Sequence, residues 1–152
     1  MVEKHDQTGM RNELTRYGDD AFPLFLRKSF IKGAGYGDDA LDRLGIGIAD
    51  TSSDVNPCHG NAQELISQVR AGVLAAGGLP MAFPTISLHE SFAHPTSMYL
   101  RNLMAMDTEE MLKSLPVDAV VLVGGCDKTV PAQVMGALSA NIPFVQLVTG
   151  PM

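Results

Sequence analysis

The chain has 152 residues, of which 45% are hydrophobic and 18% are charged, and its formal net charge is −6. This length is sufficient for one domain with a substantial core. The acidic balance and the absence of a basic stripe argue against a nucleic-acid partner. No apolar run approaches the length of a membrane span and the polar N-terminus lacks a signal-like core, so we expect no membrane partner and a cytoplasmic location.

The first predicted element is a helix over residues 22–32, because apolar side chains recur there at helical spacing from Phe22 to Phe30. The preceding residues, 1–20, are polar and irregular and are expected to form an N-terminal arm. The glycine-rich patch at 33–37 resembles a phosphate-binding loop only loosely, since no strand precedes it. We interpret this patch as a turn that ends the helix.

Apolar runs then alternate with helical patterns along the rest of the chain. Strands are predicted over residues 44–49, 81–86, 119–123 and 144–148. A helix capped by Asn61 runs to about residue 76, where Gly77 stops it. Helical patterns also begin at Pro95, at a capping-box-like Asp107, and at Pro131 with Thr129 as the cap. The alternation predicts an α/β fold of three layers, a largely parallel sheet with flanking helices.

One loop concentrates reactive side chains. Cys126, Asp127 and Lys128 directly follow the strand at 119–123, whose continuous apolar run is typical of a strand buried on both faces. In open α/β sheets, ligands bind beyond the carboxyl ends of the strands. A thiol, a carboxylate and an amine in this position predict a metal site.

Two further predicted strands end in loops that carry metal-ligand side chains. Cys58 and His59 follow the strand at 44–49, and His89 and Glu90 follow the strand at 81–86. The three loops are expected to converge at one edge of the sheet. Thiolates suit an iron–sulfur cluster or zinc, whereas carboxylates suit magnesium. A thiolate site beside a carboxylate site indicates an enzyme that uses two different metal centres as Lewis acids.

Less specific interpretations stay open at this point. The two cysteines could be ordinary buried thiols, although a disulfide is disfavoured in a reducing compartment. His59 and His89 could be hydrogen-bonded neighbours of a site, and Lys128 a charge partner, a modified amine or a base. Two cysteines cannot complete a zinc or cluster site, so a further ligand is required, either His59 or a residue outside this chain. A zinc-binding module would leave the acidic residues and Lys128 unexplained.

Several motifs together suggest a known family. They are Asn-Pro-Cys-His at 56–59, Phe-Pro-Thr-Ile-Ser at 83–87 and Gly-Gly-Cys-Asp-Lys-Thr-Val-Pro at 124–131. Over roughly residues 27–152 the chain resembles the dihydroxy-acid/phosphogluconate dehydratase family, and residues 95–107 resemble its sugar-acid (pentonate) branch. The resemblance implies that residues 21–152 form part of the family's N-terminal α/β domain, without its C-terminal β-barrel-like domain.

The resemblance also implies an activity. Members of this family are hydro-lyases that dehydrate a 2,3-dihydroxy acid or sugar acid to a 2-oxo acid, in carbohydrate acid metabolism or branched-chain amino acid biosynthesis. An iron–sulfur cluster, of the two-iron or four-iron type, and Mg²⁺ serve as Lewis acids. Full-length members are usually homodimers or homotetramers.

The family's functional residues can be carried over by position. The resemblance makes Cys58 and Cys126 cluster ligands and places His59 next to the cluster. Magnesium would be bound by Glu90, Asp127 and Lys128, the last as a carbamate with a catalytic role.

The family's chains are several times longer, and this chain lacks the third cluster cysteine, a later acidic magnesium ligand and the serine that serves as the base. We therefore expect the chain alone to be inactive. A catalytically inactive, truncated α/β fragment is the alternative function.

Overall fold

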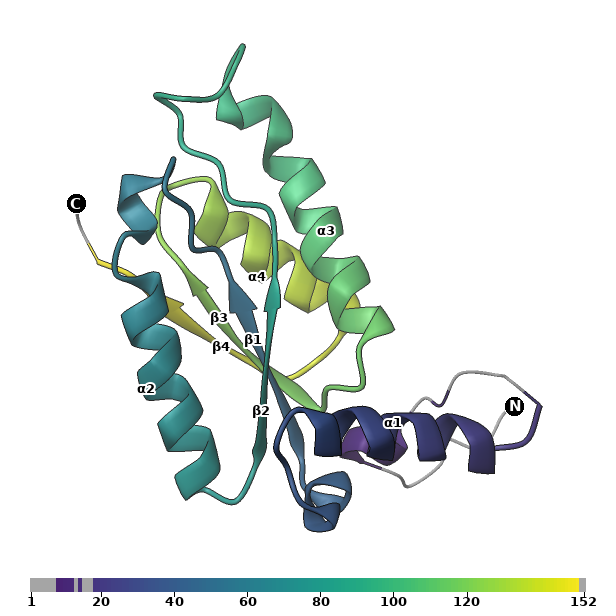
Figure 1. Cartoon of the computed structure of the whole chain (residues 1–152). Coiled ribbons are helices and arrows are strands. Elements are labelled where there is room, and N and C mark those ends of the chain that lie inside the picture. The colour runs from purple at the N-terminus through teal and green to yellow at the C-terminus, as the bar shows by residue number, and fades with distance from the viewer. Residues whose placement is uncertain (1–7, 13, 15–17, 151–152) are drawn as a thin grey trace.

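A computed structural model describes residues 8–12, 14 and 18–150, and its centre is a parallel sheet. Four strands lie in the order β2-β1-β3-β4, and each neighbouring pair is parallel (Figure 1). Their bounds are Gly45–Asp50 for β1, Leu79–Pro84 for β2, Ala119–Gly124 for β3 and Phe144–Val148 for β4. Most of the predicted N-terminal arm, residues 1–7, 13 and 15–17, lies outside the described residues.

Helices cover both faces of the sheet. One face carries α2, and the opposite face carries α3 and α4, while α1 crosses the amino ends of the strands (Figure 1). The helices are Ala21–Gly33 (α1), Ala62–Ala75 (α2), Arg101–Ser114 (α3) and Thr129–Ala140 (α4). Four short 3₁₀ turns are Gly9–Arg11 (η1), Asp38–Asp42 (η2), Pro57–His59 (η3) and Ser97–Leu100 (η4). The prediction of a three-layer α/β fold with a parallel sheet is confirmed.

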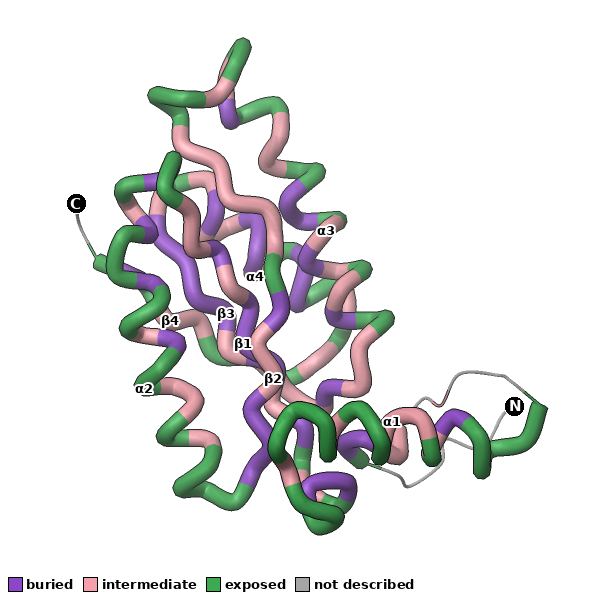
Figure 2. Tube along the Cα trace, in the orientation of Figure 1, coloured by how far each residue is buried: buried purple, intermediate pink, exposed green. Residues whose placement is uncertain are grey.

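The two central strands, β1 and β3, form the core of the molecule. Ile48 and Val123 pack against α2 at Ile66, while Leu122 packs on the other face against α3 and α4. Figure 2 shows the buried residues concentrated along these strands. Both faces are buried because helices cover both, which explains the continuous apolar runs in the sequence.

The strand order places one loop pair at the centre of the sheet. The chain passes from β1 outward to β2 and then crosses back over β1 to form β3 on its other side. The carboxyl ends of β1 and β3 are therefore adjacent at the point where the strand order reverses. Doubly wound sheets leave a crevice at this switch point.

One predicted helix start is wrong. Asp107 lies in the middle of α3, so residues 101–114 form one helix and no capping box is present at Asp107. The carboxylate instead accepts a hydrogen bond from the backbone N–H of Ile86, at 2.8 Å. A distant partner on the segment after β2 thus takes the place of the local cap.

The other predicted caps also differ from the structure. Asn61 precedes α2 as expected, but its side-chain amide donates to the carbonyl of Thr149 at 2.9 Å and makes no cap. α4 begins at Thr129 itself, whose hydroxyl is buried and has no hydrogen-bond partner among the described residues. Backbone bonds to the carbonyls of Cys126 and Lys128 satisfy the first turn instead. Gly77 does end α2, with a positive φ of 82°.

The helix predicted over residues 22–32 is confirmed as α1, but its aromatic face does not enter the described core. Phe25 is 62% exposed and Phe30 is 76% exposed. In the described part of the chain, none of the helices combines the length and the apolar character that a bilayer crossing requires.

The close packing of α3 on α4 requires glycine at position 136. A Cβ there would lie 2.6 Å from the Ala105 carbonyl oxygen and 2.8 Å from Cβ of Thr108. We expect Gly136→Ala to lower the free energy of unfolding by about 2 kcal/mol, because helix backbones would have to move apart. Urea unfolding monitored by circular dichroism measures this change.

Gly72 in α2 provides the matched control, because a Cβ there meets nothing within 4 Å. Gly72→Ala should raise the free energy of unfolding by about 0.5–1 kcal/mol through helix propensity alone. Equal effects of the two substitutions would contradict the packing argument.

Candidate functional site

The three loops that were predicted to converge do so. Cys58 lies in η3 after β1, His89 and Glu90 lie in the loop after β2, and Cys126 lies between β3 and α4. The sheet is parallel, so all three loops leave it at the same edge. Residues separated by up to 68 positions in the sequence, from Cys58 to Cys126, therefore share one site.

Sulfur and imidazole donors form one half of this site. The Sγ atoms of Cys58 and Cys126 and a ring nitrogen of His89 all lie within 4.8 Å of one another. Both cysteines are free thiols of intermediate burial. Burial, and secondly the neighbouring Cys58 thiol, raise the pKa of Cys126 to about 12. A thiolate here needs a positive partner, and a metal ion would supply one.

The backbone holds Cys126 in an uncommon conformation. Its φ is 66°, in the left-handed region that residues with a Cβ adopt at a cost of about 1–2 kcal/mol. The preceding Gly125 lies against the Cys58 loop, where a Cβ would meet the Thr149 hydroxyl at 2.2 Å and the Cys58 carbonyl oxygen at 2.9 Å. This close approach brings the two cysteine loops together.

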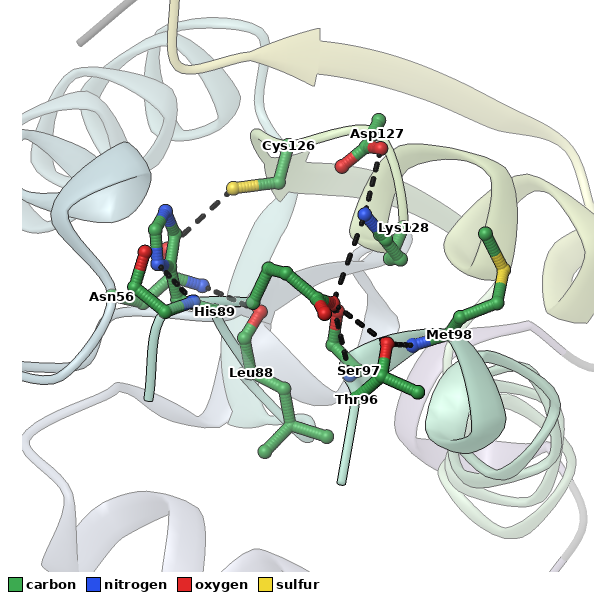
Figure 3. Close-up of polar contacts among 11 residues, drawn as sticks. Asn56, Leu88, His89, Thr96, Ser97, Met98, Cys126, Asp127 and Lys128 are labelled. Atoms are coloured by element: carbon green, nitrogen blue, oxygen red, sulfur yellow. Dashed lines mark hydrogen bonds and ion pairs between the residues drawn. The ribbon is translucent and has the colours of Figure 1, made fainter. Parts of the chain in front are cut away.

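Carboxylates form the other half of the site. The carboxylate of Glu90 accepts hydrogen bonds from the hydroxyl of Thr96 at 3.0 Å and from the backbone N–H and hydroxyl of Ser97 at 3.0 and 2.5 Å (Figure 3). These bonds, with the Ser97 hydroxyl first, lower the pKa of Glu90 below its ordinary value. They also orient the carboxylate toward α4.

Lys128 lies between the two acidic residues. Its Nζ donates to Asp127 at 2.8 Å and lies 3.9 Å from Glu90 (Figure 3). This pairing with Asp127 raises the pKa of Lys128 and lowers that of Asp127. The side chain of Lys128 is 14% exposed, whereas those of Glu90 and Asp127 are 48% and 77% exposed. The carboxylates thus face solvent around a shielded amine.

His59 is buried beneath the cysteines, with both ring nitrogens in contact with protein. Nδ1 lies 2.8 Å from the carbonyl oxygen of Thr51 and 2.9 Å from the Ser87 hydroxyl, and Nε2 lies 3.1 Å from the carbonyl oxygen of Gly125. These contacts tie the loops after β1, β2 and β3 together. His59 therefore lies next to the cysteines, but its nitrogens are occupied by the fold.

Sequence reasoning assigned no role to several residues that organise the site. The Asn56 amide contacts His59 and donates to Ser87 and to the carbonyl of Leu88, at 3.0 to 3.2 Å, and its Oδ1 lies 3.6 Å from Sγ of Cys126. The Thr149 hydroxyl donates to the carbonyl of Cys58 at 2.5 Å. Thr96 is the N-cap of η4 and Ser97 is its first residue. The Pro-Thr-Ser sequence at 95–97 could have predicted this turn, because hydroxyl residues favour such positions.

Comparisons with known proteins identify the family of this chain. Residues 43–152 match the family described as dihydroxy-acid/6-phosphogluconate dehydratase, N-terminal. The matched segment includes every residue of the site described above.

Curated relatives carry names of dehydratases. The chain is 42% identical over 137 residues to L-arabinonate dehydratase of Rhizobium leguminosarum bv. trifolii, which covers 90% of this chain and 24% of that protein. It is 47% identical over 107 residues to D-xylonate dehydratase of Caulobacter vibrioides, with coverages of 70% and 18%. It is 37% identical over 131 residues to a dihydroxy-acid dehydratase of Clostridium botulinum, with coverages of 83% and 24%. The chain thus spans about a quarter of the length of these relatives.

The contacts of His59 generate a prediction about stability. His59→Ala should lower the free energy of unfolding by about 3 kcal/mol, because it leaves buried polar partners unsatisfied and opens a cavity. His94→Ala is the control, since His94 is exposed. Urea unfolding of both variants measures the difference, and equal stabilities would contradict the role of His59 in joining the loops.

The hydrogen bonds to Glu90 generate a prediction about pH. A carboxylate whose pKa is lowered in the fold contributes stability that is complete above its ordinary value of 4.5 and is lost as pH falls through the lower folded pKa. Ser97→Ala should raise the pKa of Glu90 toward 4.5, because the hydroxyl of Ser97 is the largest cause of the shift.

Carboxyl-carbon NMR of the chain between pH 2 and 7 measures this pKa. Ser91→Ala serves as the control, because Ser91 is not among the causes of the Glu90 pKa shift. A Glu90 pKa that is unchanged by Ser97→Ala would show that this hydroxyl does not hold the carboxylate.

Proposed function

Because the chain belongs to the dihydroxy-acid/6-phosphogluconate dehydratase family, we propose that it forms part of the active site of a hydro-lyase. The proposed reaction converts a sugar acid or a 2,3-dihydroxy acid to a 2-oxo acid with loss of water. The relatives whose names specify arabinonate and xylonate favour a pentonate-type sugar acid as the substrate. Free thiols at the proposed site favour a reducing compartment, the cytoplasm.

One observation carries this proposal. A set of thiol and imidazole donors lies beside a set of carboxylates. The consecutive residues Cys126, Asp127 and Lys128 link the two sets, because Cys126 belongs to the first and Asp127 and Lys128 to the second. Thiolates and carboxylates prefer different metals, so the same metal does not suit both halves. In a dehydration that removes a proton and a hydroxyl from neighbouring carbons, two Lewis acids close together could assist the two departures separately.

The donor chemistry of the sulfur half fits an iron–sulfur cluster. Cys58 and Cys126 would provide two of its protein ligands, because their Sγ atoms lie within 4.8 Å of each other on converging loops. Burial is the largest cause of the raised pKa of Cys126, and bound iron would supply positive charge that favours the thiolate.

The donor chemistry of the oxygen half fits Mg²⁺. Glu90 and Asp127 would provide carboxylate oxygens, and both already face the same cationic group, Nζ of Lys128. When bound, the cluster and Mg²⁺ supply Lewis acids that assist departure of the C3 hydroxyl and acidify the proton on C2. Hydrogen bonds from Thr96 and Ser97 to the carboxylate of Glu90 would limit its motion in such a site.

Lys128 is proposed to act as a carbamate. Addition of CO₂ to the neutral amine forms an N–C bond, releases a proton and leaves a carboxylate on the side chain. In the metal-free chain, Asp127 favours the ammonium form, as the raised pKa of Lys128 indicates. A divalent cation on the same carboxylates would oppose that form by charge repulsion and so favour the neutral amine.

A chimera tests the proposal. This chain would replace the matching segment of the R. leguminosarum L-arabinonate dehydratase, and 2-oxo acid formation from L-arabinonate would be measured anaerobically with Mg²⁺. We expect turnover by the chimera. Cys126→Ser and Asp127→Asn should each lower kcat at least about hundredfold, since even the outer contacts of metal sites are worth up to that factor.

The control for these variants is Asp39→Asn, which removes an exposed carboxylate that forms an ion pair with Arg43. This variant should keep the turnover of the parent chimera. A chimera that folds, as judged by circular dichroism, but has no turnover would instead support an inactive α/β fragment. Turnover by the 152 residues alone would contradict the claim that further catalytic residues are required.

A further inference from the structure

We propose that α1 binds α1 of a second copy of this chain, with the two helices antiparallel. The contact would be made by one side of the helix, which we call the aromatic face. Its residues are Phe22, Phe25, Leu26, Ser29, Phe30 and Gly33. The proposed function makes no use of α1, so the inference goes beyond it.

The aromatic face is turned away from the core. Its residues are spaced alternately by three and by one position along α1, which places them on one side of the helix. Phe22, Phe25 and Phe30 are 51%, 62% and 76% exposed. Away from this face, Pro23 is buried and Ile31 packs against a core cluster. Figure 2 shows most of α1 as exposed, and exposed apolar patches of this kind often mark a protein contact.

The aromatic face is complementary to itself when two copies pack antiparallel. If the helices cross midway between residues 27 and 28, large side chains lie opposite small ones and one pair joins two aromatic rings. The three pairs are Phe22 with Gly33, Leu26 with Ser29, and Phe25 with Phe30 of the second copy. Alternation of large and small side chains lets two helices interdigitate, and the ring pair adds an aromatic contact.

The small residues of the face are ready to be covered. The hydroxyl of Ser29 donates to the carbonyl oxygen of Phe25 at 2.9 Å, so its burial leaves no donor without a partner. A Cβ at Gly33 would meet nothing within 4 Å, so the space beside this glycine is open to a ring of the second copy. Covering the face therefore has little polar cost.

The charges at the two ends of α1 favour the antiparallel orientation. Asp19 and Asp20 are exposed just before the helix. At the other end, Lys28 and Lys32 share the carboxylate of Asp38, at 2.9 and 3.0 Å, so an excess of positive charge remains there. In the proposed pair, Lys32 of one copy lies roughly 5 Å along the axis from Asp20 of the other. Opposite charges thus meet at both ends, whereas parallel packing would bring like charges together.

The size of the face suits a reversible dimer. At these exposures the three phenylalanines present about 400 Å² on each copy, if a whole side chain offers about 200 Å². The pair would bury about 800 Å² from the rings, which is below the roughly 1,200 Å² at which stable specific interfaces begin. The stems of the flanking lysines can add apolar area. We therefore expect a Kd in the micromolar range.

Sedimentation equilibrium of the reduced chain at increasing concentration tests the inference. We expect a monomer–dimer equilibrium. Phe25→Asp should raise the dimer Kd at least about tenfold, because it places two charges within the symmetric contact. Phe92→Asp is the matched control and should dimerise as the parent chain does. Phe92 is 65% exposed but lies in the loop after β2, at the other edge of the sheet.

Disulfide cross-linking tests the orientation. A background of Cys58→Ser and Cys126→Ser removes both native cysteines. One batch in this background carries Leu26→Cys and another carries Ser29→Cys. When the two batches are mixed and oxidised, the mixed disulfide should form in preference to either self-linked product, because these two positions lie opposite each other. Circular dichroism verifies that each variant is folded.

The outcomes are decisive for α1. A parent chain that stays monomeric at every concentration would overturn the inference, as would an unchanged Kd in Phe25→Asp. Preferential self-linking of Ser29→Cys would overturn the antiparallel arrangement. The aromatic face lies at the amino ends of the strands, away from the candidate site (Figure 1). Dimerisation should therefore persist in Asp127→Asn, and its loss there would contradict the assignment to α1.

Discussion

The adjacency of the carboxyl ends of β1 and β3 is the constraint on which the site depends. The strand order reverses between these two strands, so the loops that follow them meet over the middle of the sheet. The close contact at Gly125 and the buried ring of His59 then join these loops to each other and to the loop after β2. These contacts fix the relative positions of the donor side chains that the three loops carry.

Neighbouring residues in these loops belong to different halves of the site. His89 belongs to the sulfur half of the site, whereas the next residue, Glu90, turns toward Lys128 and belongs to the oxygen half. Likewise, Cys126 belongs to the sulfur half and the next residue, Asp127, to the oxygen half. Consecutive side chains in extended or turn backbone point in different directions, so two chemically distinct sites can share two short segments.

The helix signals that failed did so for one physical reason. Asp107, Asn61 and Thr129 are residue types that cap helices, and the sequence placed each of them at a plausible helix start. Asp107 and Asn61 instead bond to distant backbone groups, and Thr129 is enclosed by packing. A local cap and a tertiary hydrogen bond have similar net free energies, about 1 kcal/mol, so sequence alone could not rank them.

The sequence by itself determined the α/β class, the four strands and the presence of thiol, imidazole and carboxylate donors after three of them. These features follow from hydrophobic periodicity and from the chemistry of the residue types, which need no knowledge of contacts. Only the tertiary structure decided that His59 joins loops while His89 lies with the two cysteines, and that Thr96 and Ser97 hold Glu90. Those roles depend on which side chains meet across the sheet edge, and that is set by strand order and loop packing over long sequence distances.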